Sequence, residues 1–121
     1  MARAMTLRTA RCDAGRAPDC AEMALYLVGE PNLGGIPRDA DRASRIAKRL
    51  CDEVGPQWCG TYGHVIWFGG GKSSTFVPLL RQGCEAGNRD ACASYQTWQK
   101  PGTSEHAWAA QRICELGGSC S

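Results

Sequence analysis

The chain has 121 residues, of which 43% are hydrophobic and 21% charged, and its formal net charge is +2. This composition predicts one folded domain and excludes a disordered chain, because disorder needs low hydrophobicity and high net charge. No apolar run approaches the roughly 18 residues of a membrane-spanning helix, so we expect no membrane insertion. The small net charge argues against a nucleic-acid partner.

The cysteines form a pattern that repeats along the chain. Seven residues separate the members of each of the first three pairs, and five separate the members of the last pair. After the first cysteine of each pair come an acidic residue and then a glycine, which ends helices because it adopts positive φ cheaply. First cysteines lie 39, 33 and 30 residues apart, a period typical of stacked supersecondary units. The pairs are Cys12 and Cys20, Cys51 and Cys59, Cys84 and Cys92, and Cys114 and Cys120.

Helical patterns occupy the first half of the chain. Residues 2–13 predict a lone helix, and residues 19–29 predict a second helix with Asp19 as a possible N-cap. After a loop rich in proline and glycine, Asp39 is expected to cap a third helix that runs to about Glu53. The apolar residues of this third helix recur at i, i+3, i+4 and i+7, which places them on one face.

The second half continues the same order. Val65–Phe68 alone would suit a strand, but the repeat favours a helix over residues 57–68. We expect the next helix over residues 73–86, with Ser73 or Ser74 at its start. Pro78 would lie in about the first turn, where proline costs little. The last two helices are predicted over residues 89–100 and 104–116.

Two stretches carry a resemblance to a known family. Cys59–Gly71 tracks the first half, and Gly35–Cys51 the second half, of the repeat unit of the Sel-one-like class in the tetratricopeptide superfamily. The chain is most similar to the cysteine-rich branch typified by the Helicobacter cysteine-rich proteins, over about residues 11–120. The resemblance implies an all-α fold, an α/α-hairpin repeat solenoid of about three repeats with disulfide-clamped turns. The implied organisation is a single array over residues 1–121, with the lone helix at 2–13 and repeats at about 19–55, 57–87 and 89–117.

The resemblance also implies a role for the cysteines, since the family pairs them within each short spacing. Two cysteines that flank a tight corner between helices come within the ~4.4–6.8 Å Cα separation of a disulfide. Each short loop would add roughly 2.5 kcal/mol by chain entropy. Zinc binding and thiol chemistry remain alternatives, although both favour a C-x-x-C motif, which is missing. We therefore expect no metal and no cofactor.

The cysteines and the N-terminus give conflicting indications of the compartment. Paired cysteines imply an oxidising compartment, which favours a periplasmic or secreted protein. Residues 1–11 lack the apolar stretch of a signal peptide. A cytoplasmic protein with reduced thiols therefore remains an alternative.

Other motifs give little support for an enzyme. Phe68–Ser74 resembles a phosphate-binding loop, but the position of the first required glycine holds Ile66. His64 and His106 form no catalytic set by spacing. Phe76 and His106 stand where the third helix has the small Ala43, so we expect irregular packing in the second and third repeats.

The family pattern places six residues on the concave side of the array: Leu25, Val28, His64, Trp67, Thr97 and Lys100. An apolar stripe there predicts a non-enzymatic bacterial scaffold or adaptor that binds a protein or peptide, with buried aromatic anchors providing the affinity. One alternative is a weak β-lactam-binding or hydrolysing enzyme, to which the family has been linked, although no S-x-x-K motif occurs. The other alternative is a cytosolic thiol or metal sensor.

Overall fold

The computed structural model describes residues 10–29 and 38–117 of the chain. These residues are mostly helical and contain no β-strand, which confirms the all-α prediction. Of the predicted lone helix over 2–13, the described part (residues 10–13) is helical, and the remainder lies outside the described residues. The further elements are α2 (Ala17–Leu27), α3 (Ala40–Arg49), the π-helical η2 (Leu50–Val54), α4 (Trp58–Phe68), α5 (Ser73–Glu85), α6 (Arg89–Thr97) and α7 (Ser104–Glu115).

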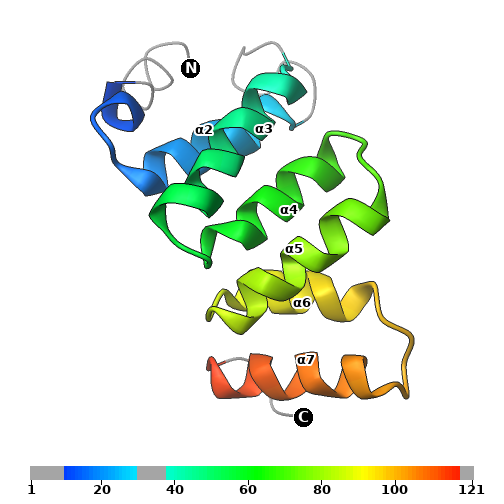
Figure 1. Ribbon diagram of the computed structural model, residues 1–121. Helices are drawn as coiled ribbons and strands as arrows, with labels where there is room; N and C mark the ends of the chain where they lie inside the picture. Colours follow the sequence, from blue (N-terminus) through cyan, green and yellow to red (C-terminus); the bar gives the residue numbers. More distant parts are fainter. Residues whose placement is uncertain (1–9, 30–37, 118–121) are drawn as a thin grey trace.

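Consecutive helices run back and forth and pack against one another (Figure 1). Helix α3 lies between α2 and α4, helix α5 lies between α4 and α6, and α7 packs mainly against α6. The turns therefore gather at two opposite edges. We call the edge with the corners at residues 13–17, 52–57 and 86–88 the disulfide edge, on the left in Figure 1. The opposite edge, with the connections at residues 69–72 and 98–103, is the loop edge.

The beginnings of the helices test the predicted caps. Asp39 caps α3 as predicted, because its Oδ1 accepts a hydrogen bond from the Arg42 backbone N–H at 3.1 Å. Asp19 is not a cap, since α2 begins at Ala17 with Pro18 in its first turn. Proline suits that position because the first N–H groups of a helix have no partner within the helix.

The predicted ends and interruptions differ in two places. Helix α6 stops at Thr97 rather than at Lys100, which precedes Pro101 and is therefore disfavoured in a helical conformation. Pro78 is the sixth residue of α5, beyond the first turn, yet α5 continues to Glu85. The prediction of a helix rather than a strand over residues 57–68 is confirmed by α4.

Three disulfides bridge successive corners of the disulfide edge. They join Cys12 to Cys20, Cys51 to Cys59 and Cys84 to Cys92, with Cα separations of 4.6, 4.4 and 4.5 Å. Each bond ties the end of one helix to the first turn of the next. Cys114 is also disulfide-bonded, and Cys120, its expected partner, lies outside the described residues.

The second corner contains one extra residue before its glycine. At the third corner Gly87 has a φ of 100°, and the Gly87 and Asn88 N–H groups donate to carbonyls of α5. At the second corner the π-helical η2 takes up the extra residue, with the Gly55 N–H donating to the Leu50 carbonyl at 3.1 Å. Gly55 is extended there, so it does not end the helix by positive φ as predicted. The widened turn keeps the spacing between the two cysteines unchanged.

Glycine lets helices cross closely in the middle of the molecule. A Cβ on Gly83 would lie 2.5 Å from the Cα of Gly60, so the backbones of α5 and α4 touch there. Gly63 faces the Leu80 side chain and the Phe76 carbonyl, each 3.1 Å from where a Cβ would lie. The large Phe76 ring itself is accommodated in the core, where it is only 2% exposed.

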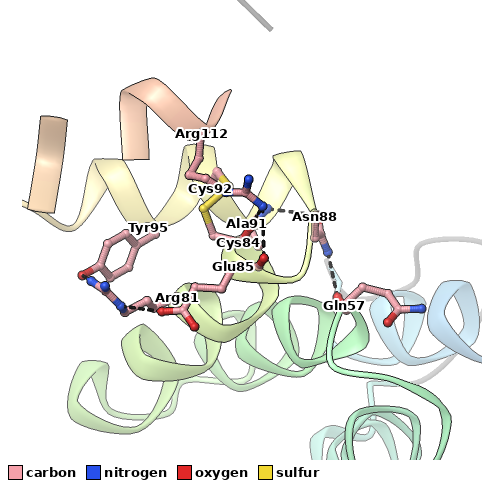
Figure 2. Close-up of a disulfide and its surroundings, with 9 residues drawn as sticks. All are labelled: Gln57, Arg81, Cys84, Glu85, Asn88, Ala91, Cys92, Tyr95 and Arg112. Atoms are coloured by element: carbon pink, nitrogen blue, oxygen red, sulfur yellow. Dashed lines mark hydrogen bonds and ion pairs between the residues drawn. A yellow bond between two sulfur atoms is a disulfide. The ribbon is translucent and has the colours of Figure 1, made fainter. Parts of the chain in front are cut away.

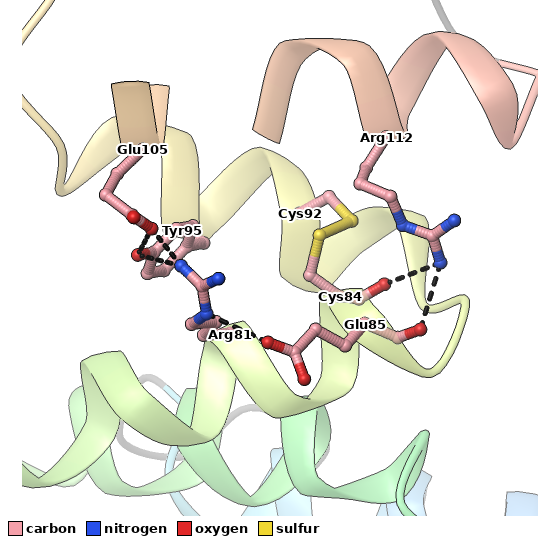
Figure 3. Close-up of polar contacts among 7 residues, drawn as sticks. All are labelled: Arg81, Cys84, Glu85, Cys92, Tyr95, Glu105 and Arg112. Carbon is pink, nitrogen blue, oxygen red and sulfur yellow. Dashed lines mark hydrogen bonds and ion pairs between the residues drawn. A yellow bond between two sulfur atoms is a disulfide. The ribbon is translucent and has the colours of Figure 1, made fainter. Parts of the chain in front are cut away.

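Helix α7 packs differently from α3 and α5. It buries Ala109, whereas His106 stays half-exposed at the position, eight residues before a cysteine, that the buried Ala43 and Phe76 fill in α3 and α5. Arg112 donates from Nη2 to the carbonyls of Cys84 and Glu85, at 3.1 and 3.0 Å. These bonds satisfy the C-terminal end of α5, as Figure 3 shows.

Polar side chains join helices at the disulfide edge and between α5 and α7. Asn88 accepts from the Ala91 N–H to cap α6, and its Nδ2 donates to the Gln57 carbonyl at 3.1 Å (Figure 2). Arg81 on α5 forms an ion pair with Glu105 on α7, and it lies over the ring of Trp108, 4.4 Å from the ring centroid. Helices α5 and α7 are thus connected by charged as well as aromatic contacts.

Candidate functional site

An aromatic cluster lies toward the loop edge and takes residues from three helices. We call it the aromatic patch; it comprises His64, Trp67, Phe68, Phe76 and Trp98. Two of its rings reach the surface, since Phe68 is 48% exposed and Trp98 42% exposed. Phe76 is only 2% exposed and anchors the patch in the core.

The helix ends bring these rings together. Trp67 and Phe68 end α4, Phe76 lies in the first turn of α5, and Trp98 directly follows α6. The Trp67 ring stacks on Phe76 at 5.6 Å between centroids and meets the edge of Trp98 at 5.4 Å. Such pairs contribute about 0.5–1.5 kcal/mol beyond the area they bury. The exposed rings are therefore held in a fixed arrangement by the buried ones.

His64 joins the patch to the neighbouring helix α6. Its Nε2 lies 2.6 Å from the Ser94 Oγ, and its ring stacks on Phe68 at 5.8 Å. Burial lowers the pKa of His64, while the charge of Asp90 opposes that shift. A neutral imidazole is therefore favoured at neutral pH. No carboxylate among the described residues hydrogen-bonds this ring, so the pair lacks the orienting third group of a catalytic triad.

The six predicted partner-binding residues differ in their exposure and location. His64 and Trp67 meet in the aromatic patch and are half-buried. Leu25, Thr97 and Lys100 are exposed. Val28 is only 3% exposed, so its prediction as a groove residue is wrong.

The burial of Val28 results from the return of α3 over the end of α2. The N–H of Asp39 donates to the carbonyl of Leu27 at 2.8 Å, which brings the start of α3 over the end of α2. Val28 then packs into the core with residues of α3. The remaining members of this core cluster are Met23, Ala24, Leu27, Ala43, Ala47 and Val65.

Three residues of the aromatic patch were missing from the prediction, namely Phe68, Phe76 and Trp98. None of them occupies the repeat position that was assigned to the concave side. A usable indication was available, because aromatic residues stand at the ends of α4 and α6 and at the start of α5. Rings at helix ends that meet at one edge form a surface that single-helix periodicity does not reveal.

A cleft of about 440 Å³ opens at the N-terminal part of the disulfide edge. Its lining includes Met23, Ile46 and Leu50, with Arg42 and Arg49 among its polar groups. Arg49 is already paired with Glu53 at 2.9 Å. None of the predicted partner-binding residues lines this cleft, so it gives no support to the predicted groove.

The described residues offer no group of three or more His, Cys, Asp or Glu side chains arranged to hold a metal ion. Within the same residues, no helix is long and apolar enough to cross a membrane. In this part of the chain, the aromatic patch and the cleft are the surface features that invite a functional explanation.

The chain is similar to one protein of stated role. It is 33% identical over 76 residues to the cytochrome c oxidase assembly factor 7 homolog of Drosophila melanogaster, a match covering 57% of this chain. The match spans 28% of the relative's length. No protein-family model matches the chain. No solved structure matches it either.

Proposed function

We propose that this chain is a non-catalytic module that binds a protein partner through the aromatic patch at its loop edge. The observation that carries the proposal is the exposure of Phe68 and Trp98 beside the half-buried Trp67. Aromatic side chains held rigidly at a surface are typical of binding hot spots, because they bury much area with little loss of conformational freedom. The proposed binding surface thus lies at the loop edge and not along the predicted concave stripe. His64 and Trp67 belong to both surfaces.

The module itself is proposed to be a Sel-one-like helical-hairpin array. Support comes from the recurring corners, in which a disulfide joins the end of one helix to the start of the next. Further support comes from α3 and α5, which each pack between the helices on either side of them in the chain. Stacked hairpins of this kind present extended surfaces for other proteins.

The cellular role is proposed from the relative. A protein named as a cytochrome c oxidase assembly factor suggests that this chain also helps a multi-subunit oxidase to assemble, by holding a subunit or another factor. We place this role in an oxidising compartment, because the described cysteines are all disulfide-bonded.

Complementation tests the proposal. The gene is deleted in its own organism, and the fully assembled oxidase is measured by native electrophoresis and by its turnover of reduced cytochrome c. A copy carrying Phe68→Ser and Trp98→Ser should leave assembly as poor as the deletion, while the wild-type copy restores it.

A matched control shows whether the loss of assembly is specific to the patch. Val54 is 56% exposed at the disulfide edge and lines the cleft, so Val54→Ser removes an exposed apolar side chain away from the patch and also tests the cleft as the binding surface. The control should restore assembly fully, and all variants should accumulate equally. Normal assembly with the Phe68 and Trp98 variant would refute the proposed function.

A further inference from the structure

We propose that the partner segment recognised by the aromatic patch is acidic and carries an apolar anchor residue. This inference rests on the proposed function and specifies the chemistry of its partner. The patch offers exposed rings to the anchor, and the chain around it offers positive charge to the flanking residues.

The apolar half of the recognition comes from the exposed rings. Phe68 and Trp98 both contact the Trp67 ring, at 5.3 and 5.4 Å between centroids. Because Trp67 also stacks on the buried Phe76, these rings are fixed before a partner arrives. A leucine or phenylalanine side chain placed on them would bury apolar area without first ordering the surface.

The charged half comes from three cations, one bonded to the Phe68 carbonyl and two that lie within four residues of Phe68 or Trp98 along the chain. Arg38 donates a hydrogen bond from Nη2 to the Phe68 carbonyl, which holds its guanidinium at the end of α4. Lys72 precedes α5 in the short connection that follows Phe68, and Lys100 follows Trp98 by two residues. Both lysines are exposed, and no carboxylate partner is found for either among the described residues.

None of the carboxylates near the patch is found paired with Lys72 or Lys100 among the described residues. Asp39 and Asp41 carry their negative charge at the start of α3, where Asp39 accepts from the Arg42 N–H. The charge of Asp90 acts on His64, and Glu105 is engaged by Arg81 and accepts a hydrogen bond from the Tyr95 hydroxyl at 2.7 Å. The two unpaired ammonium groups therefore favour an acidic partner over a basic one by charge complementarity.

The test uses three short synthetic peptides labelled with fluorescein. The acidic probe has glutamates around two leucines, the basic probe has lysines in place of the glutamates, and the polar probe has serines in place of the leucines. Fluorescence anisotropy with the full chain at low salt measures each affinity. We expect the acidic probe to bind at least about tenfold more tightly than either of the others, and to weaken as salt rises.

Two variants separate the contribution of the lysine charges to binding from that of the aromatic rings. The double reversal of Lys72→Glu and Lys100→Glu should abolish or invert the preference for the acidic probe, because it changes only exposed charges. Trp98→Ser should weaken binding of both leucine-containing probes. Circular dichroism before each titration confirms that the variant is folded.

The outcomes distinguish this inference from the proposed function. Equal or tighter binding of the basic probe, or an unchanged preference after the double lysine reversal, overturns the acidic assignment. If the Phe68 and Trp98 variant still fails in complementation, the proposed function survives that result. Concentration-dependent dimerisation that is lost in Trp98→Ser would instead assign the patch to a second copy and also overturn the inference.

Discussion

The two edges of the molecule are built in opposite ways. At the disulfide edge, short corners are closed by covalent bonds, and the Cys84–Cys92 pair is completely buried. Asn88 and Arg112 add hydrogen bonds that satisfy the backbone of neighbouring helices. At the loop edge, aromatic rings hold the connections together, and Phe68 and Trp98 remain about half in solvent.

This contrast separates stability from recognition. The corner between α5 and α6, where the cross-linked Cys84 and Cys92 are fully buried, contributes to folding and leaves little apolar area for a partner to bury. An edge held by partly exposed rings still has apolar area to lose on binding. We therefore expect substitutions at the disulfide edge and in the helix crossings to act on the free energy of unfolding, and substitutions at the loop edge to act on binding.

The largest effect is expected where two backbones touch. Gly83→Ala would place a Cβ 2.5 Å from backbone atoms of Gly60, so α4 and α5 must separate. Overpacking of this kind costs about 3 kcal/mol of unfolding free energy. Gly70→Ala at the loop edge is the matched control: its Cβ meets nothing within 4 Å, and only the positive φ of 87° opposes it. Urea denaturation of both variants measures the difference, and equal costs would contradict the close crossing.

Removal of a buried disulfide should have the next largest effect. Replacing Cys84 and Cys92 together by alanine relaxes a short loop, which costs about 2.5 kcal/mol by chain entropy. The unfolding midpoint in urea should fall accordingly, while binding of the acidic probe persists under conditions where the variant stays folded. A variant as stable as wild type would show that this corner does not depend on its cross-link.

Removal of an exposed ring should cost less stability than either change above. Phe68→Ser removes a ring that is 48% exposed together with its stacking on His64 and Trp67, so we expect a loss of about 1–2 kcal/mol of unfolding free energy. Val54→Ser at the disulfide edge should cost less than about 1 kcal/mol. In binding, Phe68→Ser should lose the acidic probe and Val54→Ser should keep it. A large loss of stability in Phe68→Ser would mean that this ring belongs to the core instead of a binding surface.

The smallest effect is expected on the free energy of unfolding at acid pH, through His64, which joins α4 to α6. Burial lowers the pKa of His64 below its ordinary value of 6.5, so the unfolded chain binds this proton more readily than the folded one. Stability should therefore decline as pH falls below about 6.5. His64→Gln should reduce this decline between pH ~7.5 and ~5.5. The urea midpoints of unfolding at the two pH values test this prediction. A fall in stability that His64→Gln leaves unaltered would exclude His64 as its source.

Local features were predictable from the sequence. The cap by Asp39 depends on residues three positions apart, and the cysteine corners depend on segments of about ten residues. The helix over residues 57–68 followed from the repeat even though Val65–Phe68 has strand-like composition. In each case the deciding contacts lie close together along the chain.

Contacts between distant segments were harder to predict. The burial of Val28 depends on how α3 returns over α2, and the pairing of Trp67 with Trp98 depends on how α4 and α6 pack around α5. The closeness of α4 and α5 depends on Gly60 and Gly83, which carry no apolar side chain and so leave no mark in a hydrophobic pattern. Residue positions within one repeat therefore identified two members of the patch and missed the others.

The most direct test of the separation between the edges is complementation with paired variants. The assembled oxidase is measured after deletion of the gene and its replacement by the Phe68→Ser and Trp98→Ser copy, or by the Val54→Ser copy. We predict that the disulfide-edge variant restores assembly and the loop-edge variant does not, at equal protein levels. Equal restoration by both copies would contradict the assignment of binding to the loop edge.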